Sequence, residues 1–276
     1  MTGDISRGIT LTTYGTAFLQ NNYDISGLTL DHPSFTFENK VEFLFFKKHF
    51  FSKPTWHQYA DSPINWLKKL KKEGCKELRL VFRPDNSISL NGQKVPDHKL
   101  AGFVGGGGHR YIQTIFEKSA DLWQSKEVVT DKDAPDRRIW TISYGRTITG
   151  QQIQAKIQYN IDNIKQKLKG ILTEISAFAN KENQSFWSKE FDTAINLLDS
   201  PTPFVNNQDN RIIPAEKMNL KLIQLLAGSG KAWCFGGMGS WNDISFIDKD
   251  KQTTYDKLTA ELYDIVNESY IAVANS

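Results

Sequence analysis

Side chains that could do chemistry gather in one glycine-rich segment, residues 233–243, near the end of the 276-residue chain. Three of the four positions 236–239 are glycine, which lets a backbone adopt positive φ and approach a ligand closely. A hydroxyl, an indole, an amide and a carboxylate follow directly. We identify as candidate catalytic residues Ser240 and Asp243, and as candidate ligand-binding residues Gly236, Gly237, Gly239, Trp241 and Asn242. The alternative, which we favour, is a hairpin over residues 231–247 whose tryptophan returns to the core.

A second glycine run stands in front of a histidine and an arginine. Successive glycines expose backbone N–H groups, and adjacent cations place positive charge beside a bound anion. The candidate ligand-binding residues of this run are Gly105, Gly106, Gly107, Gly108 and Arg110. If the two glycine segments converge, His109 serves as acid or base, Arg110 as an anion clamp and Asp243 as their partner. The alternative is a flexible loop with His109 and Arg110 in solvent.

Sequence motifs of known enzyme classes are missing. The run Gly228–Lys231 resembles a phosphate-binding loop only in its Gly-Lys pair, since Leu225 stands where a glycine is needed, and we expect it to end a helix. The five histidines show no spacing typical of a metal site, and no run has the full pattern of a calcium loop. We expect no cofactor and no metal.

The composition is that of a soluble globular protein, with 39% hydrophobic and 24% charged residues. No apolar run is long enough to span a membrane, and no secretory signal precedes the first polar residues. The two cysteines, Cys75 and Cys234, are far apart and indicate neither a disulfide framework nor a zinc site. We therefore expect a cytoplasmic protein without a membrane partner.

Basic and aromatic residues are concentrated in residues 40–83, which carry eleven Lys or Arg and four acids. The aromatic ones are Phe43, Phe45, Phe46, Phe50, Phe51, Trp56, Tyr59 and Trp66. Such a composition is typical of surfaces that stack bases and neutralise phosphates, so single-stranded nucleic-acid binding is one hypothesis. We favour the alternative, in which Lys68 and Lys72 lie on the polar side of a helix and the alternating aromatic residues are buried.

Residues 1–148 read as a β-rich half that forms an antiparallel or mixed sheet. We predict strands over residues 9–19, 35–45, 77–83 and 138–146, with a break at residues 38–40, a hairpin or meander through residues 87–90, and turns over residues 121–136. The exception is a helix that begins after Ser62, where Pro63 takes the first helical position, and ends before Gly74.

Residues 149–276 read as a helical half. Isoleucines and leucines recur three or four residues apart from Ile153 to Phe178, which predicts one long helix of about 28 residues, opened by Thr149 and Gln152. Further helices are predicted over residues 185–198, 214–227 and around 258–266. With the hairpin 231–247 returning to the sheet, the fold class is α+β, and we expect residues 1–276 to form one compact unit.

Three functions remain, and the sequence favours the first. A non-catalytic protein-binding or assembly protein, with another protein or a second copy as partner, fits the aromatic content and the long striped helix. The second is an enzyme or a binder of a small anion such as a phosphate, built on residues 105–110 and 236–243. The third is binding of single-stranded nucleic acid through residues 40–83.

Overall fold

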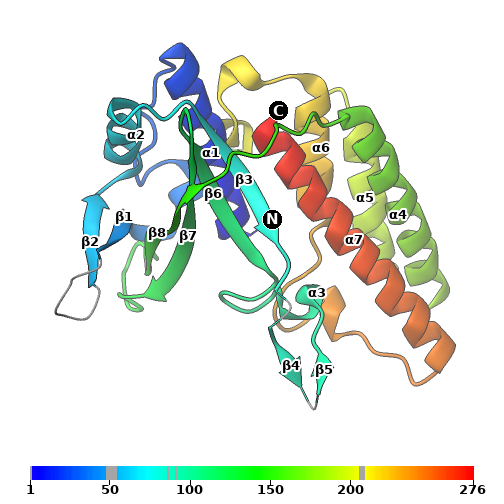
Figure 1. Ribbon diagram of the computed structural model, residues 1–276. Coiled ribbons are helices and arrows are strands. Elements are labelled where there is room, and N and C mark those ends of the chain that lie inside the picture. The colour runs from blue at the N-terminus through cyan, green and yellow to red at the C-terminus, as the bar shows by residue number, and fades with distance from the viewer. Residues whose placement is uncertain (1, 48–54, 86, 91, 205–208) are drawn as a thin grey trace.

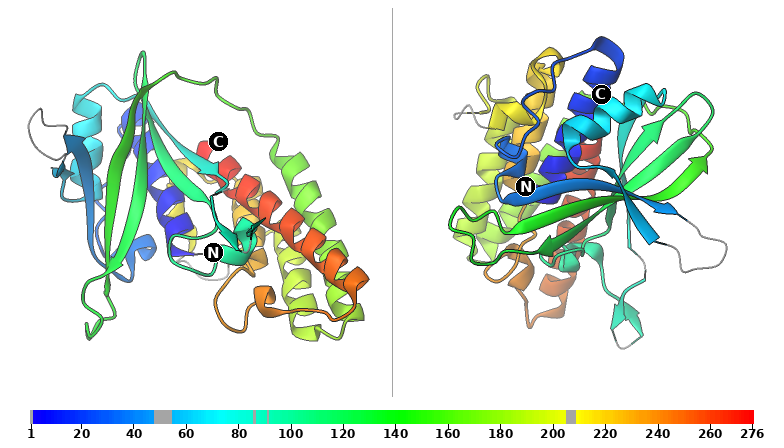
Figure 2. Two further views of the ribbon diagram at one scale, coloured as in Figure 1. Left: turned by 60° about the horizontal axis from the view of Figure 1, so that its bottom comes forward. Right: turned by 90° about the vertical axis from the view of Figure 1, so that its left-hand side faces the viewer.

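The computed structural model describes residues 2–47, 55–85, 87–90, 92–204 and 209–276, and it confirms the α+β class. A mixed six-stranded sheet lies in the N-terminal half, and the C-terminal half is helical and includes a long C-terminal helix (Figure 1). Helix α1 (Gly3–Asn21) contacts both the sheet and the C-terminal helix α7 (Lys249–Asn275). Figure 2 shows α1 between these two parts.

The strands of the sheet follow the order β2-β1-β8-β7-β6-β3. Strands β1 and β8 are parallel, and all other neighbours in the sheet are antiparallel. The bounds are β1 Glu38–Lys47, β2 Thr55–Ala60, β3 Glu77–Arg83, β6 His109–Ile115, β7 Ala120–Val129 and β8 Trp140–Gln151. A separate small ribbon pairs β4 Ser89–Leu90 with β5 Gln93–Lys94.

The other helices are α2 Pro63–Lys72, α3 Asp97–Leu100, α4 Ile161–Lys181, α5 Ser185–Asp199 and α6 Leu220–Ala232. Helix α2 begins as predicted, because the Ser62 hydroxyl accepts a hydrogen bond from the backbone N–H of Asn65 at 3.3 Å. It covers the sheet through Trp66, whose ring stacks on Phe43 at 4.3 Å between centroids. Large aromatic rings therefore fill the core between the sheet and α2. Among the described residues, no helix is both long and apolar enough to cross a membrane.

The prediction of a strand over residues 9–19 was wrong, because these residues lie within α1. Threonines and aromatic residues have high strand propensity, but most of this helix is buried, and burial decides the outcome. The Thr13 hydroxyl donates to the backbone oxygen of Ile9, which satisfies it inside the helix. Gly8 and Gly15 allow close packing, since a Cβ at Gly15 would lie 2.3 Å from the Leu78 side chain.

The predicted long helix is shorter at its start. Strand β8 continues to Gln151, a stretch outside helix and strand follows, and α4 begins only after Asn160, whose side chain accepts from the backbone of Asn163 at 3.0 Å. Ile157 is 64% exposed, so the apolar spacing before residue 160 has no buried face to support a helix. The proposed capping residues Thr149 and Gln152 do not start a helix.

The hairpin over residues 231–247 does not exist. Helix α6 runs through Gly228–Lys231, which we expected to end a helix, and an irregular loop with a short 3₁₀ helix, Trp241–Asp243, follows it. Gly228 lies within the helix and allows close packing on α5, since a Cβ there would lie 2.4 Å from the Leu198 side chain. Phe235 and Trp241 of this loop pack on Tyr263 and Phe191 of the helical half, and the predicted return of Trp241 to the core is confirmed.

Smaller predictions also fail. Strand β1 continues through residues 38–40 without the expected hairpin, although its pairing with β8 shifts register between Glu38 and Lys40, and residues 121–129 of the expected turn region belong to β7. Residues 87–90 do not extend a meander from β3, because β3 pairs with β6 and the small strand β4 pairs with β5. Helix α6 begins at Leu220, six residues after the proline that was expected to open it.

The edge strand β3 is closed by side chains. The Thr16 hydroxyl of α1 bonds both the backbone N–H and the backbone oxygen of Leu78, each at 3.0 Å. The Asn275 amide of α7 does the same for Leu80, at 2.8 Å and 2.9 Å. Two helices thus occupy backbone groups that an edge strand usually exposes.

Candidate functional site

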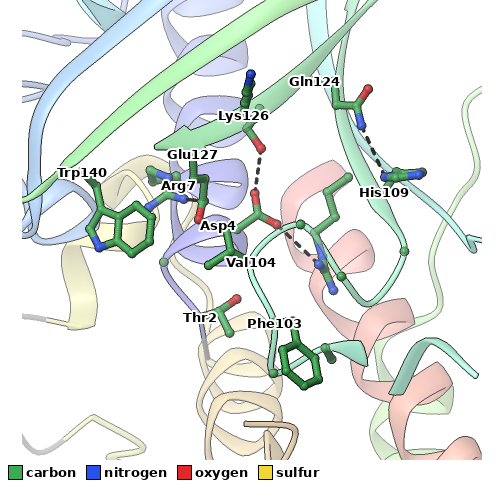
Figure 3. Close-up of a pocket in the computed structure, with 18 of the residues that line it drawn as sticks. Thr2, Asp4, Arg7, Phe103, Val104, His109, Gln124, Lys126, Glu127 and Trp140 are labelled. Atoms are coloured by element: carbon green, nitrogen blue, oxygen red, sulfur yellow. Dashed lines mark hydrogen bonds and ion pairs between the residues drawn. The ribbon is translucent and has the colours of Figure 1, made fainter. Parts of the chain in front are cut away.

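A cavity of about 520 Å³ opens where the N-terminus of α1, the loop of residues 101–108 and strands β1, β6, β7 and β8 meet (Figure 3). Gly105, Gly106 and Gly108 of the first run lie in its wall together with Arg110, whereas Gly107 does not line it. The second glycine segment, residues 236–243, does not line it. The cavity therefore contains one of the two glycine segments proposed as a site.

Three of the four glycines of the first run are closely packed. A Cβ at Gly106 would lie 2.3 Å from the backbone oxygen of Leu100, and one at Gly108 would lie 2.6 Å from Phe82. The Tyr263 hydroxyl of α7 donates to the backbone oxygen of Gly107, whereas a Cβ at Gly105 would meet nothing within 4 Å. Residues 106–108 are therefore packed against α3, β3 and α7.

Arg110 crosses the cavity wall instead of standing in solvent, and its side chain is 9% exposed. Its guanidinium donates to the Asn267 side chain at 2.5 Å and lies 3.4 Å from the Asp4 carboxylate. It also lies over the rings of Phe82 and Trp233, at 5.2 Å and 5.8 Å from their centroids. Arg110 thus connects β6 with α1 and α7.

A buried ion cluster forms the floor of the cavity, and sequence reasoning missed it. Arg7 of α1 contacts the carboxylates of Glu38 on β1 and Glu127 on β7 (Figure 3 labels Arg7 and Glu127). Arg7 and Glu38 are each 4% exposed, and Glu127 is 22% exposed. No local pattern marks these residues, because they come from three elements and α1 was predicted as a strand. Burial of charge is costly without a counter-charge, and Arg7 is the counter-charge of both carboxylates here.

Tyr144 lies against this cluster from the core side. Burial raises the pKa of its phenol, while the positive charge of Arg7 acts in the opposite direction. The ring stacks on Phe43 at 5.2 Å between centroids. The floor of the cavity is therefore supported directly by the aromatic core.

His109 points away from Arg110, because neighbouring residues of a strand face opposite sides of a sheet. Its ring nitrogens lie 3.6 Å from the Asp85 carboxylate and 3.3 Å from the Gln124 amide. Two hydrogen bonds from Ser87, with a smaller contribution from His109, lower the pKa of Asp85. The structure does not join the His109 ring and the Arg110 guanidinium into one acid–base site.

The second glycine segment forms a structural turn. The Ser240 hydroxyl accepts from the backbone of Asn242 at 3.3 Å, and the Asp243 carboxylate accepts from the backbone of Gly239. The Trp241 indole is buried and donates to the Thr259 hydroxyl at 2.8 Å. Both candidate catalytic side chains therefore serve the local fold.

The second glycine segment contacts the chain just before the first run. A Cβ at Gly102 would lie 2.0 Å from the backbone oxygen of Gly236. The Asn242 amide donates to the backbone oxygen of His98 at 2.7 Å. These contacts lie outside residues 105–110, and Asp243 does not line the cavity that His109 and Arg110 line.

The basic and aromatic segment 40–83 is divided between two faces of the sheet. Phe43 and Trp66 are buried on the side of α2, whereas Phe46 and Trp56 pair across β1 and β2 and are exposed on the other side. The lysines of α2 stay on its own side, where Lys71 donates to the backbone oxygen of Phe18. Phe50 and Phe51 lie outside the described residues. The exposed aromatic rings and the basic helix do not form one surface.

Within the described ranges, no group of three or more His, Cys, Asp or Glu side chains is arranged to hold a metal ion. Comparisons of the chain with protein-family models, with curated proteins and with solved structures find no match.

Proposed function

We propose that this protein binds a small molecule in the cavity between α1, the loop 101–108 and the sheet. The observation that carries the proposal is the pair of buried arginines, Arg7 and Arg110, which line one cavity and are both held by carboxylates. Ion pairs buried at this depth add little stability compared with an apolar core, so clefts that contain them are candidates for binding sites.

The position of the cavity supports the same proposal. It lies where the sheet meets α1 and close to α7, and ligand sites often occur between structural units. Its lining combines charged side chains with aromatic rings, including Trp140 and Phe103 (Figure 3). Binding is favoured over catalysis because His109 faces away from the arginines and Ser240 and Asp243 serve a turn.

A thermal-shift screen of small metabolites tests the proposal, because a ligand of the native state raises the melting temperature. Val104→Trp narrows the mouth of the cavity at a residue that is 63% exposed. Ile157→Trp is the matched control, 64% exposed and outside the cavity lining. We expect a ligand that stabilises the wild type and the control but binds the Val104 variant at least about tenfold more weakly. A screen without such a ligand contradicts the proposal.

A second candidate is binding of another protein or a second copy, and exposed aromatic residues favour it. Phe46 of β1 and Trp56 of the edge strand β2 face each other on the outer side of the sheet. Light scattering of the wild type and of Trp56→Ser tests self-association, and pull-down tests a foreign partner. A monomeric wild type that retains no partner contradicts this candidate.

We also propose a reducing compartment, the cytoplasm, as the location. Cys75 and Cys234 are free and buried, and burial raises the pKa of the Cys75 thiol to about 12, so it stays protonated and unreactive. Fractionation of the source cell tests this location, and recovery outside the cytoplasm contradicts it.

A further inference from the structure

The charges on the cavity floor do not balance. Three carboxylates, Asp4, Glu38 and Glu127, meet two guanidinium groups, those of Arg7 and Arg110. The positive end of α1 offsets part of the excess, about half a charge. The floor therefore retains negative charge, which disfavours the anionic ligand expected from the glycine run.

The other cations near the cavity do not face this floor. Ser125 and Glu127 of β7 both point toward α1, where they contact Asp4 and Arg7, so Lys126 between them points to the opposite side of the sheet. Figure 3 shows the Lys126 side chain extending away from Asp4. His109 also faces away from Arg110, toward Asp85.

The hydrogen-bonding capacity of the carboxylates in the cavity also favours a positively charged ligand. A carboxylate accepts up to four hydrogen bonds and donates none. Asp4 accepts one from the Ser125 hydroxyl at 3.1 Å and a long one from Arg110 at 3.4 Å, and Glu127 contacts Arg7 through Oε1. Both carboxylates are partly exposed, 27% for Asp4 and 22% for Glu127, so a ligand can reach them. Asp4 and Glu127 therefore keep unused acceptor capacity that a ligand with donors can fill, whereas Arg7 Nε is a buried donor without a partner among the described residues.

Aromatic rings stand above this floor. Phe37, Phe103, Trp140 and Trp233 all line the cavity, and Phe37 and Phe103 are exposed. Aromatic faces attract cations and also cover the apolar body of a ligand. Donors, positive charge and an apolar body together describe an organic amine or guanidine.

We infer that the cavity binds a small organic cation, an amine or guanidine on an apolar or aromatic body, with Asp4 and Glu127 as its acceptors. The inference rests on the proposed small-molecule function and names its ligand class.

Three probes of one shape test the charge preference: phenethylamine, 2-phenylethanol and 3-phenylpropionate. Calorimetry on the full chain should give tightest binding for the amine, at least about tenfold weaker binding for the alcohol, and the weakest for the carboxylate. Raising the salt concentration from about 50 to about 500 mM should weaken binding of the amine several-fold and leave binding of the alcohol unchanged, because salt screens charge.

Glu127→Gln should weaken binding of the amine at least about tenfold and should change the affinity for the alcohol by less than about twofold. The matched control is Glu174→Gln on α4, which lies outside this cavity. Because Glu127 also pairs with Arg7, Asp4→Asn is made in parallel, and thermal melts show whether each variant is folded. A folded Asp4 variant that binds the amine as tightly as the wild type overturns the inference.

The two proposals fail differently. If the carboxylate or the alcohol binds as tightly as the amine, and Val104→Trp blocks it, the ligand class is wrong and the small-molecule function stands. If none of the three probes binds and the screen yields a neutral or anionic ligand that Val104→Trp blocks, the inference is overturned in the same way. If neither the probes nor the screen yields a ligand sensitive to Val104→Trp, both fail.

Discussion

The two glycine-rich segments are alike in sequence but differ in what surrounds them. Residues 101–108 form the wall of a cavity whose floor holds buried charges, whereas residues 236–243 close a turn whose polar side chains bond their own backbone. Glycine density is thus a sign of tight backbone packing in both places. What separates them is the charge that other elements bring to the first segment.

The largest expected effect tests whether the buried charges are essential to the fold around the first segment. Arg7→Met leaves the buried Glu38 and the partly exposed Glu127 without this cation, which should cost about 3 to 5 kcal/mol of unfolding free energy in urea titrations. The control is Lys221→Met, which removes an ion pair with Asp162 in solvent and should cost less than about 1 kcal/mol. An equal loss of unfolding free energy in the two variants would show that the Arg7 cluster contributes no more to stability than an ion pair in solvent.

The next effect sharpens the comparison between the two segments themselves. Gly102→Ala forces a Cβ to within 2.0 Å of the Gly236 backbone oxygen and should destabilise the protein by about 2 to 3 kcal/mol. Gly237→Ala, in the second segment, meets no atom within 4 Å and should change stability by less than about 0.5 kcal/mol. Thermal melts compare the two variants. A silent Gly102→Ala would mean that the segments are not in contact in solution.

The smallest effect concerns the junction of the segments, where His98 is buried and its backbone oxygen accepts from Asn242. Burial lowers the pKa of His98 from 6.5 to about 4. Below pH 6.5 the His98 ring therefore binds a proton in the unfolded chain but stays neutral in the native protein, and the free energy of unfolding falls as the pH falls toward 4. For this residue the loss at pH 5.5 is about 1.4 kcal/mol relative to neutral pH.

Urea titrations of the wild type and of His98→Gln at pH 7.5 and 5.5 measure this contribution. The variant should lose about 1.4 kcal/mol less than the wild type over this interval. His32, whose pKa burial also lowers to about 4, remains in both proteins and accounts for part of the shared loss. An identical pH dependence in the two proteins would place His98 in solvent.

The sequence predicted correctly those helices whose ends or apolar faces are marked by local residues. Helix α2 has Ser62 as its cap and α5 follows a clear apolar stripe, and both lie where the sequence placed them. Helix α1 was missed because its threonines favour strands locally, while its burial depends on β3, more than fifty residues away. Local patterns report propensity, and only long-range packing decides which propensity is expressed.

The sequence could mark candidate residues that follow one another along the chain. It could not mark residues that come from separate elements and meet only in the folded structure. Gly105, Gly106, Gly108 and Arg110, which the sequence marked as candidates, line the cavity, and their role in binding stays a prediction. Glu38 and Glu127 meet Arg7 only because β1 and β7 lie on either side of β8 in the sheet. Such a cluster has no spacing in the sequence from which to recognise it.

The closure of strand β3 by Thr16 and Asn275 has a consequence for biosynthesis. Chains are made from the N-terminus, so the sheet and α1 leave the ribosome well before α7 does. During that interval Thr16 can already bond Leu78, but the backbone of Leu80 has no amide partner until α7 docks. A nascent chain therefore exposes a short, half-open strand edge, the kind of surface on which chains pair wrongly and which chaperones cover.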